Sequence, residues 1–223
     1  MKTQKDKFIE ENNIKIHVKN VYKNFKDKEV LKDISLEMES GNIYGIVGHN
    51  GSGKTVLFKC ICGFYKCTKG VITINDKIMG QDIDMLRNAG VIIEEPGFIR
   101  KWNGYNNLKF LYNINNRTDK DYLYDIIRKV GLDPESKTHV EKYSLGMKQR
   151  LAIAQAIMEN PDILILDEPM NGLDKNGIDR MRKIFLDMKE QGKLIILASH
   201  NKEDINILCD KVYEMENGVL TQL

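Results

Sequence analysis

Residues 48–55 read GHNGSGKT, and no other segment limits the possible folds of this chain as strongly. The segment matches the phosphate-binding loop G-x-x-x-x-G-K-[ST], whose backbone N–H groups wrap an anion ahead of a helix N-terminus. A short apolar run at 42–47 precedes the loop, and an apolar segment suited to a helix follows at 56–62. A strand before and a helix after are what the motif requires, so the sequence predicts nucleotide binding.

Each residue type in this loop has a chemical role in holding a nucleotide. Glycine relieves the steric limits on a backbone that approaches phosphate oxygens closely. We expect the Lys54 ammonium to reach the β- and γ-phosphates and the Thr55 hydroxyl to ligate Mg²⁺. The residues expected to bind the phosphates of ATP are Gly48, His49, Asn50, Gly51, Ser52, Gly53, Lys54 and Thr55.

A second chemical signal follows an apolar strand later in the chain. Residues 163–166 lead directly into Asp167 and Glu168, and carboxylates at the C-terminal end of a parallel strand lie where α/β proteins bind ligands. We expect Asp167 to hold Mg²⁺ opposite Thr55 and Glu168 to polarise the attacking water as general base. Two acids alone would more simply solvate a strand end, but the phosphate loop favours the catalytic interpretation.

A histidine follows the apolar run 194–198. A neutral imidazole at His200 can hydrogen-bond a γ-phosphate oxygen and help to fix the attacking water; a surface histidine that ends a strand is the competing interpretation. The candidate catalytic residues are Glu168, His200 and Lys54.

Composition limits the partners of the chain. The 223 residues are 42% hydrophobic and 30% charged, enough for one large domain or two intimate lobes. A net charge of +2, from 34 basic and 32 acidic residues, argues against nucleic acid held by bulk electrostatics. No apolar run approaches the roughly 20 residues of a membrane-spanning helix, and the N-terminus lacks the apolar stretch of a secretory signal. We therefore expect membrane contact only through a partner.

The four cysteines, Cys60, Cys62, Cys67 and Cys209, lack the paired spacing of a zinc site. We expect them to act as small apolar residues in a reducing cytosol. The predicted location is cytoplasmic.

The apolar patterning predicts an α/β protein with a parallel-sheet core. Residues 1–13 are polar and charged, typical of an N-terminal tail, and residues 96–157 show helical spacing typical of an inserted helical lobe. The core should comprise residues 14–94 and 158–223. The expected strands cover 14–18, 30–38, 42–47, 70–76, 89–93, 162–166, 193–198, 211–215 and 218–222.

Residues 143–150, YSLGMKQR, resemble the L-S-G-G-Q signature of ATP-binding cassette (ABC) transporters and lie 23 residues before Asp167, the usual interval in that family. Phe25 resembles the aromatic that stacks on adenine, Asp174 resembles the D-loop aspartate, and His200 resembles the switch histidine. The chain therefore resembles the nucleotide-binding subunit of these transporters from about Val18 to its end.

This resemblance implies a P-loop NTPase fold with a RecA-like core, a β-rich N-terminal subdomain and a helical subdomain. It implies ATP and Mg²⁺ as ligands and two copies paired head to tail, with Ser144 and the Gly146 N–H binding the partner's γ-phosphate. It also implies a separate transmembrane permease, so that the protein would be peripheral on the inner face of the plasma membrane. Phe25 and Asp174 complete the expected ATP-binding set, and no nucleic acid is expected.

The chain departs from the family pattern at four positions. Glu94 occupies the Q-loop position, 40 residues after Lys54, where it can still ligate Mg²⁺ but adds negative charge near phosphates. Leu145 and Met147 replace a glycine and a glutamine of the signature, and Asn171 replaces the commoner serine. We expect slower or more conditional hydrolysis, because Lys54, Glu168 and His200 are all present.

Residues 94–98, EEPGF, and the variant signature together resemble the bacitracin and lantibiotic self-protection branch of the family. That resemblance implies export of a peptide antibiotic or a similar amphipathic compound. Residues 96–110, with Trp102 and Tyr105, would receive a short cytoplasmic helix of the permease; alternatively Trp102 is a core residue of the helical lobe.

Two other functions compete with transport. A non-transport ABC ATPase, acting as a mechanical or regulatory module, would usually need a long inserted coiled coil or two cassettes in one chain. A phosphate-loop kinase would lack the signature segment. The sequence favours a transporter subunit over both.

Overall fold

The computed structural model describes residues 13–26 and 28–223. The polar tail predicted for residues 1–13 lies outside the described residues, apart from Asn13. All but one of the strands of the central six-stranded sheet run parallel, in the order β10–β9–β3–β8–β7–β6. The strands are β3 (Ile43–Val47), β6 (Ala89–Ile92), β7 (Ile163–Asp167), β8 (Leu194–Ala198), β9 (Lys211–Glu216) and the antiparallel β10 (Val219–Gln222).

Burial explains why β3, β7 and β8 are almost wholly apolar. Every residue of β8 is buried, as are the first four residues of β3 and of β7. A parallel sheet covered on both faces needs such continuous apolar runs, because neither side of a strand meets water.

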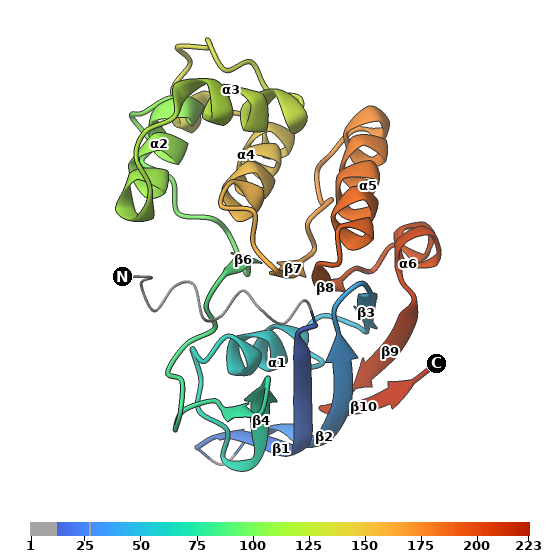
Figure 1. Ribbon diagram of the computed structural model, residues 1–223. Helices are drawn as coiled ribbons and strands as arrows, with labels where there is room; N and C mark the ends of the chain where they lie inside the picture. Colours follow the sequence, from blue (N-terminus) through green and yellow to red (C-terminus); the bar gives the residue numbers. More distant parts are fainter. Residues whose placement is uncertain (1–12, 27) are drawn as a thin grey trace.

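A second, antiparallel sheet covers one face of this core. Its order is β2–β1–β4–β5, with β1 (Lys15–Phe25), β2 (Lys28–Glu39), β4 (Lys69–Ile74) and β5 (Lys77–Ile78). Helix α1 (Lys54–Ile61) packs with β1 and β2 in one apolar cluster that reaches the central sheet. In Figure 1, α1 lies between the antiparallel strands and the centre of the molecule.

The other face is covered by helices. A helical lobe, defined as α2 (Gly104–Asn115), α3 (Lys120–Lys129), the short η2 (Val140–Lys142) and α4 (Leu145–Ile157), stands apart from the antiparallel sheet (Figure 1). Helices α5 (Lys175–Glu190) and α6 (Lys202–Leu208) follow β7 and β8 and share one core cluster with the lobe. The side chains of Asn103, Asp119 and Ser144 cap α2, α3 and α4 by accepting backbone N–H bonds.

Most of the predicted elements are present, and the differences have local causes. The chain continues as strand beyond the predicted residues 14–18 because β1 passes through bulges, one of them near Asn20, whose φ is +49°. Helix α6 and strand β5 were not predicted, since seven and two residues are too few to show a period. The hairpin at Asn217 and Gly218 is confirmed, with φ values of +49° and +83°.

Cys60 and Cys62 are buried, and all four cysteines are free thiols, as the sequence predicts. Within residues 13–26 and 28–223, the structure contains no helix long and apolar enough to cross a membrane.

Candidate active site

Three neighbouring strands deliver the predicted catalytic groups to one edge of the sheet. β3 leads into the phosphate loop, β7 ends at Asp167, and β8, which lies between them, leads to His200. Because the carboxyl ends of parallel strands meet at the same edge, segments distant in sequence become neighbours there. The loop, the acids and the histidine therefore belong to one site.

The phosphate loop has a backbone that only glycine tolerates at two positions. At Gly48 φ is +148°, and a Cβ atom there would lie 2.2 Å from the carbonyl oxygen of Met215. At Gly53, directly before α1, φ is +120°. The Ser52 hydroxyl is buried at this turn and has no hydrogen-bond partner in the part of the chain that the structure describes. An orphaned buried hydroxyl next to a helix N-terminus fits a site that binds phosphate.

Lys54 is folded back onto the loop it belongs to. The residue is only 7% exposed, and its ammonium donates to the carbonyl oxygens of Gly48, at 2.7 Å, and His49, at 3.1 Å. These two bonds satisfy a cation that burial would otherwise penalise. They also hold the ammonium against the loop.

Thr55 and Asp167 meet across the site. The Thr55 Oγ1 donates to Oδ2 of Asp167 at 2.6 Å, so two hard oxygen donors from different elements lie together. Mg²⁺ prefers such oxygens, bound through one or two protein groups with phosphate and water completing the octahedron. The oxygens of Thr55 and Asp167 therefore have the chemistry to hold a Mg²⁺ that a bound nucleotide also ligates.

Glu168 and His200 form the other half of the chemistry. The Oε2 of Glu168 lies 2.9 Å from Nδ1 of His200, and the glutamate side chain is largely sheltered while the histidine is exposed. The backbone N–H of Glu168 donates to Ala198 O at 3.0 Å, which fixes the end of β7 against β8. The structure therefore brings together the two residues that the sequence assigned to base and switch.

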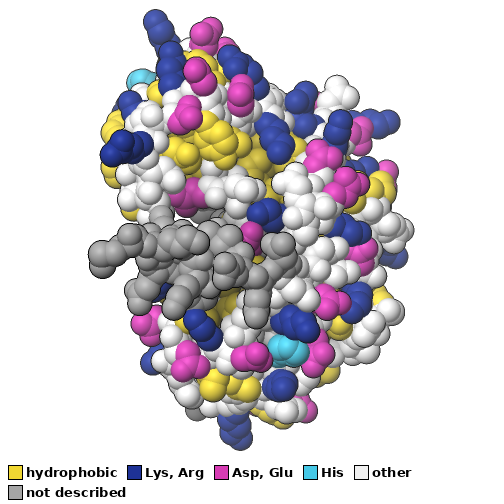
Figure 2. Space-filling view, in the orientation of Figure 1, with side chains coloured by type: hydrophobic (Ala, Val, Ile, Leu, Met, Phe, Trp, Pro, Cys, Tyr) yellow, Lys and Arg dark blue, Asp and Glu magenta, His cyan; other side chains and the backbone are white. Residues whose placement is uncertain are grey.

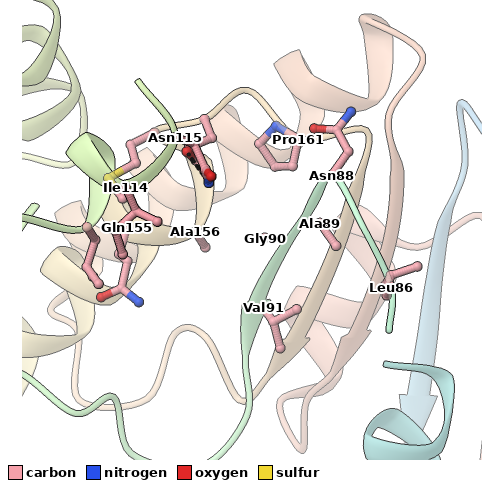
Figure 3. A pocket seen from close by; sticks show the side chains of 13 residues that line it. Leu86, Asn88, Ala89, Gly90, Val91, Ile114, Asn115, Gln155, Ala156 and Pro161 are labelled. Carbon is pink, nitrogen blue, oxygen red and sulfur yellow. Dashed lines mark hydrogen bonds between the residues drawn. The ribbon is translucent and has the colours of Figure 1, made fainter. Parts of the chain in front are cut away.

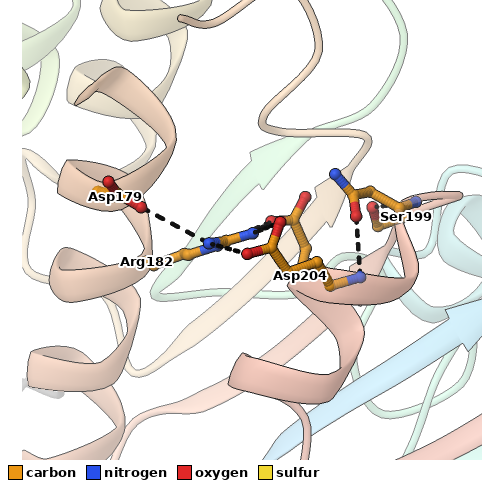
Figure 4. Close-up of polar contacts among 6 residues, drawn as sticks. Asp179, Arg182, Ser199 and Asp204 are labelled. Atoms are coloured by element: carbon orange, nitrogen blue, oxygen red, sulfur yellow. Dashed lines mark hydrogen bonds and ion pairs between the residues drawn. The ribbon is translucent and has the colours of Figure 1, made fainter. Parts of the chain in front are cut away.

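A buried ion pair anchors the turn that carries His200. Asn201 caps α6 by accepting from Glu203 N at 2.8 Å, and its own N–H donates to Ser199 Oγ at 3.1 Å. One turn further, Asp204 accepts from Arg182 of α5 at 2.5 and 2.8 Å, with both residues buried (Figure 4). The pair joins α6 to α5 and so fixes where the His200 turn begins.

The signature residues lie at the start of α4. Ser144 is exposed and its hydroxyl caps the helix by accepting from Met147 N at 3.2 Å. The next residue, Leu145, is 64% exposed. A Cβ atom at Gly146 would lie 2.7 Å from Gly172 O, so α4 contacts the segment after Glu168 at close range. Asp174 accepts from Arg150 of α4, and no side-chain bond from it caps α5.

Phe25 and Glu94 have partners that the sequence did not indicate. The Phe25 ring is 40% exposed and meets Tyr65 edge-on, with 5.3 Å between centroids. Glu94 has a φ of +61° and accepts from Lys59 of α1 at 2.5 Å. This bond raises the pKa of Lys59, because the carboxylate stabilises the ammonium. Of the three residues expected to ligate Mg²⁺, Thr55 and Asp167 are bonded to each other, whereas Glu94 is paired with Lys59.

A comparison with known families tests this arrangement. The ABC transporter family model matches residues 31–171, which is more than half of the chain. The chain belongs to the ABC transporter family.

Related proteins and a solved structure agree. An uncharacterized ABC transporter ATP-binding protein, YybJ of Bacillus subtilis, is 44% identical over 205 residues, which are 92% of this chain and 94% of that protein. The bacitracin transport ATP-binding protein BcrA of Enterococcus faecalis is 36% identical over 93% of this chain and 68% of its own length. The lantibiotic transport ATP-binding protein SrtF of Streptococcus pyogenes is 33% identical over 87% and 84%.

A solved structure described as an ATP-binding subunit of an ABC transporter superimposes with a TM-score of 0.82 and 25% identity, covering 93% of this chain and 90% of that one. The chain is therefore an ATP-binding subunit of an ABC transporter, and an ATPase. The predicted fold, with its RecA-like core, β-rich subdomain and helical subdomain, is confirmed. ABC ATP-binding subunits of transporters work with a membrane permease.

Sequence reasoning missed three residues of this ABC site. Tyr65 lies beside Phe25, and Gln149 and Arg150 join α4 to the segment 168–174. Gln149 and Arg150 stood in the quoted signature, but spacing alone gave no reason to assign them contacts.

Proposed function

We propose that two copies of this subunit enclose two Mg·ATP molecules and that their closing and parting drives a separate permease. One observation carries the proposal. The phosphate loop, Thr55–Asp167 and Glu168–His200 gather at one edge of the sheet, whereas Ser144 starts a different helix with its side chain exposed. A helix N-terminus binds anions, so the signature is available to the nucleotide of a second copy. In a pair related by a twofold axis, the phosphate loop of each copy would face the signature residues of the other.

Within this site each residue has a distinct role. Mg²⁺ would be held by Thr55 and Asp167 and would neutralise phosphate charge; Glu94 becomes a further ligand, directly or through water, if it leaves Lys59. Lys54 stabilises the β- and γ-phosphates. Glu168 accepts a proton from the attacking water, and His200 holds the carboxylate and contacts the γ-phosphate.

The remaining assigned residues bind the rest of the nucleotide or connect the copies. Phe25, supported edge-on by Tyr65, offers its exposed ring to adenine. Asp174 accepts a hydrogen bond from Arg150 of α4, and we expect it to lie close to the other copy. The phosphate loop residues His49, Asn50 and Gly51 are all exposed.

We assign the helical lobe, residues 96–157, as the subdomain that meets the permease, and residues 14–94 and 158–223 as the core. Besides Leu145 of the signature, four large apolar side chains of the lobe are exposed: Ile99, Trp102, Phe110 and Ile114. Figure 2 shows apolar side chains gathered over this lobe. The Trp102 ring meets Phe110 edge-on at 5.6 Å and is 38% exposed, which favours an anchor over a core residue. Tyr105 is half-buried and meets Tyr124 edge-on, with 5.2 Å between the ring centroids.

A cavity of about 360 Å³ continues this surface between the lobe and the edge strand β6. Figure 3 shows Ile114 and Asn115 of α2, Gln155 of α4 and Val91 of β6 around it. Leu86, Leu111 and Met158 add apolar walls. The polar side chains of Asn88, Asn115, Gln155 and Glu159 also line this cavity. An amphipathic helix binds through its apolar face, so we propose that the cytoplasmic helix of the permease docks on the exposed apolar side chains beside the cavity.

The relatives support a proposal for the cargo of transport, and the direction is part of the same proposal. BcrA is a bacitracin transport protein and SrtF a lantibiotic transport protein, which supports export of a peptide antibiotic or similar amphipathic compound here. The protein would then act in the cytoplasm at the inner face of the plasma membrane. Among the described residues the longest helix, α5, has 16 residues, so nothing in this part of the chain favours the coiled coil of a non-transport ABC machine.

The test is ATP turnover in Glu168→Gln, with Glu135→Gln as the control. Glu135 is exposed on the lobe, and within residues 13–26 and 28–223 its carboxylate makes no hydrogen bond or ion pair. We expect Glu168→Gln to retain nucleotide binding and lose turnover by about 10²-fold or more, as removal of a general base does. Unchanged turnover would contradict the assignment.

A further inference from the structure

The proposed base, Glu168, has an unusual backbone conformation. Its φ is +50°, in the left-handed region, which is energetically unfavourable for an L-amino acid that has a side chain. Such a conformation persists where surrounding contacts fix it. The contacts that fix Glu168 therefore bear on where its carboxylate points.

Gln149 of α4 supplies two of these contacts. Its Nε2 donates to the carbonyl oxygen of Pro169 at 2.8 Å and to that of Glu168 at 3.3 Å. A primary amide has two N–H groups, so one side chain spans two successive carbonyls. Glu168 O also receives Asn171 N at 3.3 Å. The turn after Glu168 is thus held by hydrogen bonds from α4 as well as by a bond within the segment itself.

Helix α4 contacts the same segment at two further points. The side chain of Leu145 packs on Gly172, where an added Cβ would lie 2.6 Å from the leucine Cδ2. Arg150 binds Asp174 and also donates to Gly131 O at 3.1 Å. Of these three attachments, the one made by Gln149 reaches the Glu168 peptide itself.

We propose that Gln149 is a positioning residue, which holds the Glu168 peptide so that the carboxylate stays 2.9 Å from His200 and faces the attacking water. The inference rests on the proposed role of Glu168 as general base. Without the two amide bonds, the peptide after Glu168 can rotate and move the carboxylate. Displacing a reacting group by about 1 Å costs on the order of 10²-fold in rate. Lys54 lies at the start of α1, and its bonds to the Gly48 and His49 carbonyl oxygens do not involve α4, so we expect ATP binding to change little.

The test compares three substitutions at position 149. Gln149→Met keeps the length without donors, Gln149→Glu keeps the shape but turns acceptors toward the carbonyls, and Gln149→Lys restores donors on a chain of similar length. We expect kcat to fall about 10- to 100-fold in the methionine and glutamate variants, with KM for ATP changed less than about threefold. The lysine variant should recover part of the loss. Gln191→Met, on an exposed glutamine at the end of α5, is the matched control.

Different failures have different meanings. Wild-type kcat in both Gln149→Met and Gln149→Glu, together with a loss in Glu168→Gln, overturns the positioning role and leaves the base intact. A parallel rise in KM, or no recovery in Gln149→Lys, shows a general structural role and also overturns it. Full turnover in Glu168→Gln overturns the proposed base and the inference with it. If Gln149→Met is unfolded by circular dichroism, Gln149→Glu decides. In the Glu168→Gln background, Gln149→Met should cause no further loss.

Discussion

The phosphate half and the signature half of the site are built in opposite ways. On the phosphate side, Lys54 is 7% exposed and bonded to its own loop, and Thr55 is bonded to Asp167. On the signature side, Ser144 and Leu145 begin α4 in the open, and Leu145 is 64% exposed. Both halves end in a helix N-terminus, but only the first is enclosed by its own chain. In the dimer that we propose, one copy would bind a nucleotide through its phosphate half and present its signature half to the nucleotide of the other copy.

Removing the phosphate-side cation should have the largest effect. Lys54→Ala deletes the buried ammonium, and a lost charge contact to a transferring phosphate costs about 10³-fold in turnover. Because the same ammonium binds the ground-state nucleotide, ATP binding should fall as well, as read by equilibrium dialysis. Lys129→Ala, on an exposed lysine of α3, is the control. Retained ATP affinity in Lys54→Ala would break the distinction between the two halves.

The signature half should fail differently. Ser144→Arg places a bulky side chain at an exposed helix start, so the single copy should fold and bind ATP as before. Turnover should nevertheless drop by roughly 10²-fold, because the contact to the other copy's phosphate is lost. ATP affinity and turnover, measured on the same preparation, separate the two effects. Equal loss of both would show that Ser144 serves its own chain's nucleotide.

The phosphate half also depends on distant packing. Asp204→Asn removes the main carboxylate partner of the buried Arg182 guanidinium, which keeps its longer contacts to Asp179 and Glu203. A buried charge left wholly unpaired costs about 3–5 kcal/mol, so the loss of stability should be at most of that size. Breaking the exposed Arg128–Asp125 pair with Asp125→Asn should cost less than about 1 kcal/mol. Urea unfolding measures both. If both variants lowered the free energy of unfolding by a similar small amount, the Arg182–Asp204 pair would not be needed to hold the His200 turn in place.

The smallest effect is expected at Glu94. Glu94→Gln removes one negative charge near the phosphates and frees Lys59 from its ion pair. A like-charge contact near water is worth about 1 kcal/mol, so turnover at saturating Mg²⁺ should rise up to about fivefold. Stability should barely change, because the carboxylate is 65% exposed. Slower turnover in Glu94→Gln would show instead that the carboxylate serves as a metal ligand.

The sequence predicted the residues of the phosphate half better than the contacts that hold these residues in place. A fixed motif predicts the phosphate loop at Gly48–Thr55, and an apolar run that ends in acids predicts Asp167 and Glu168. Both predictions succeed because neighbouring residues in the sequence determine the structure there. The helical lobe was predictable from its 3.6-residue spacing. The Glu94–Lys59 pair, the Phe25–Tyr65 contact and the bonds of Gln149 depend on how separate elements pack, which no local pattern records.

The most direct test of the account is the mass of Glu168→Gln in solution by light scattering, with and without Mg·ATP. We predict an increase from 25.7 kDa to twice that value when Mg·ATP is present. Adding Ser144→Arg to the same protein should abolish the increase. A mass that stays at one copy with saturating nucleotide, even beside the permease, or that doubles regardless of Ser144, would contradict the account.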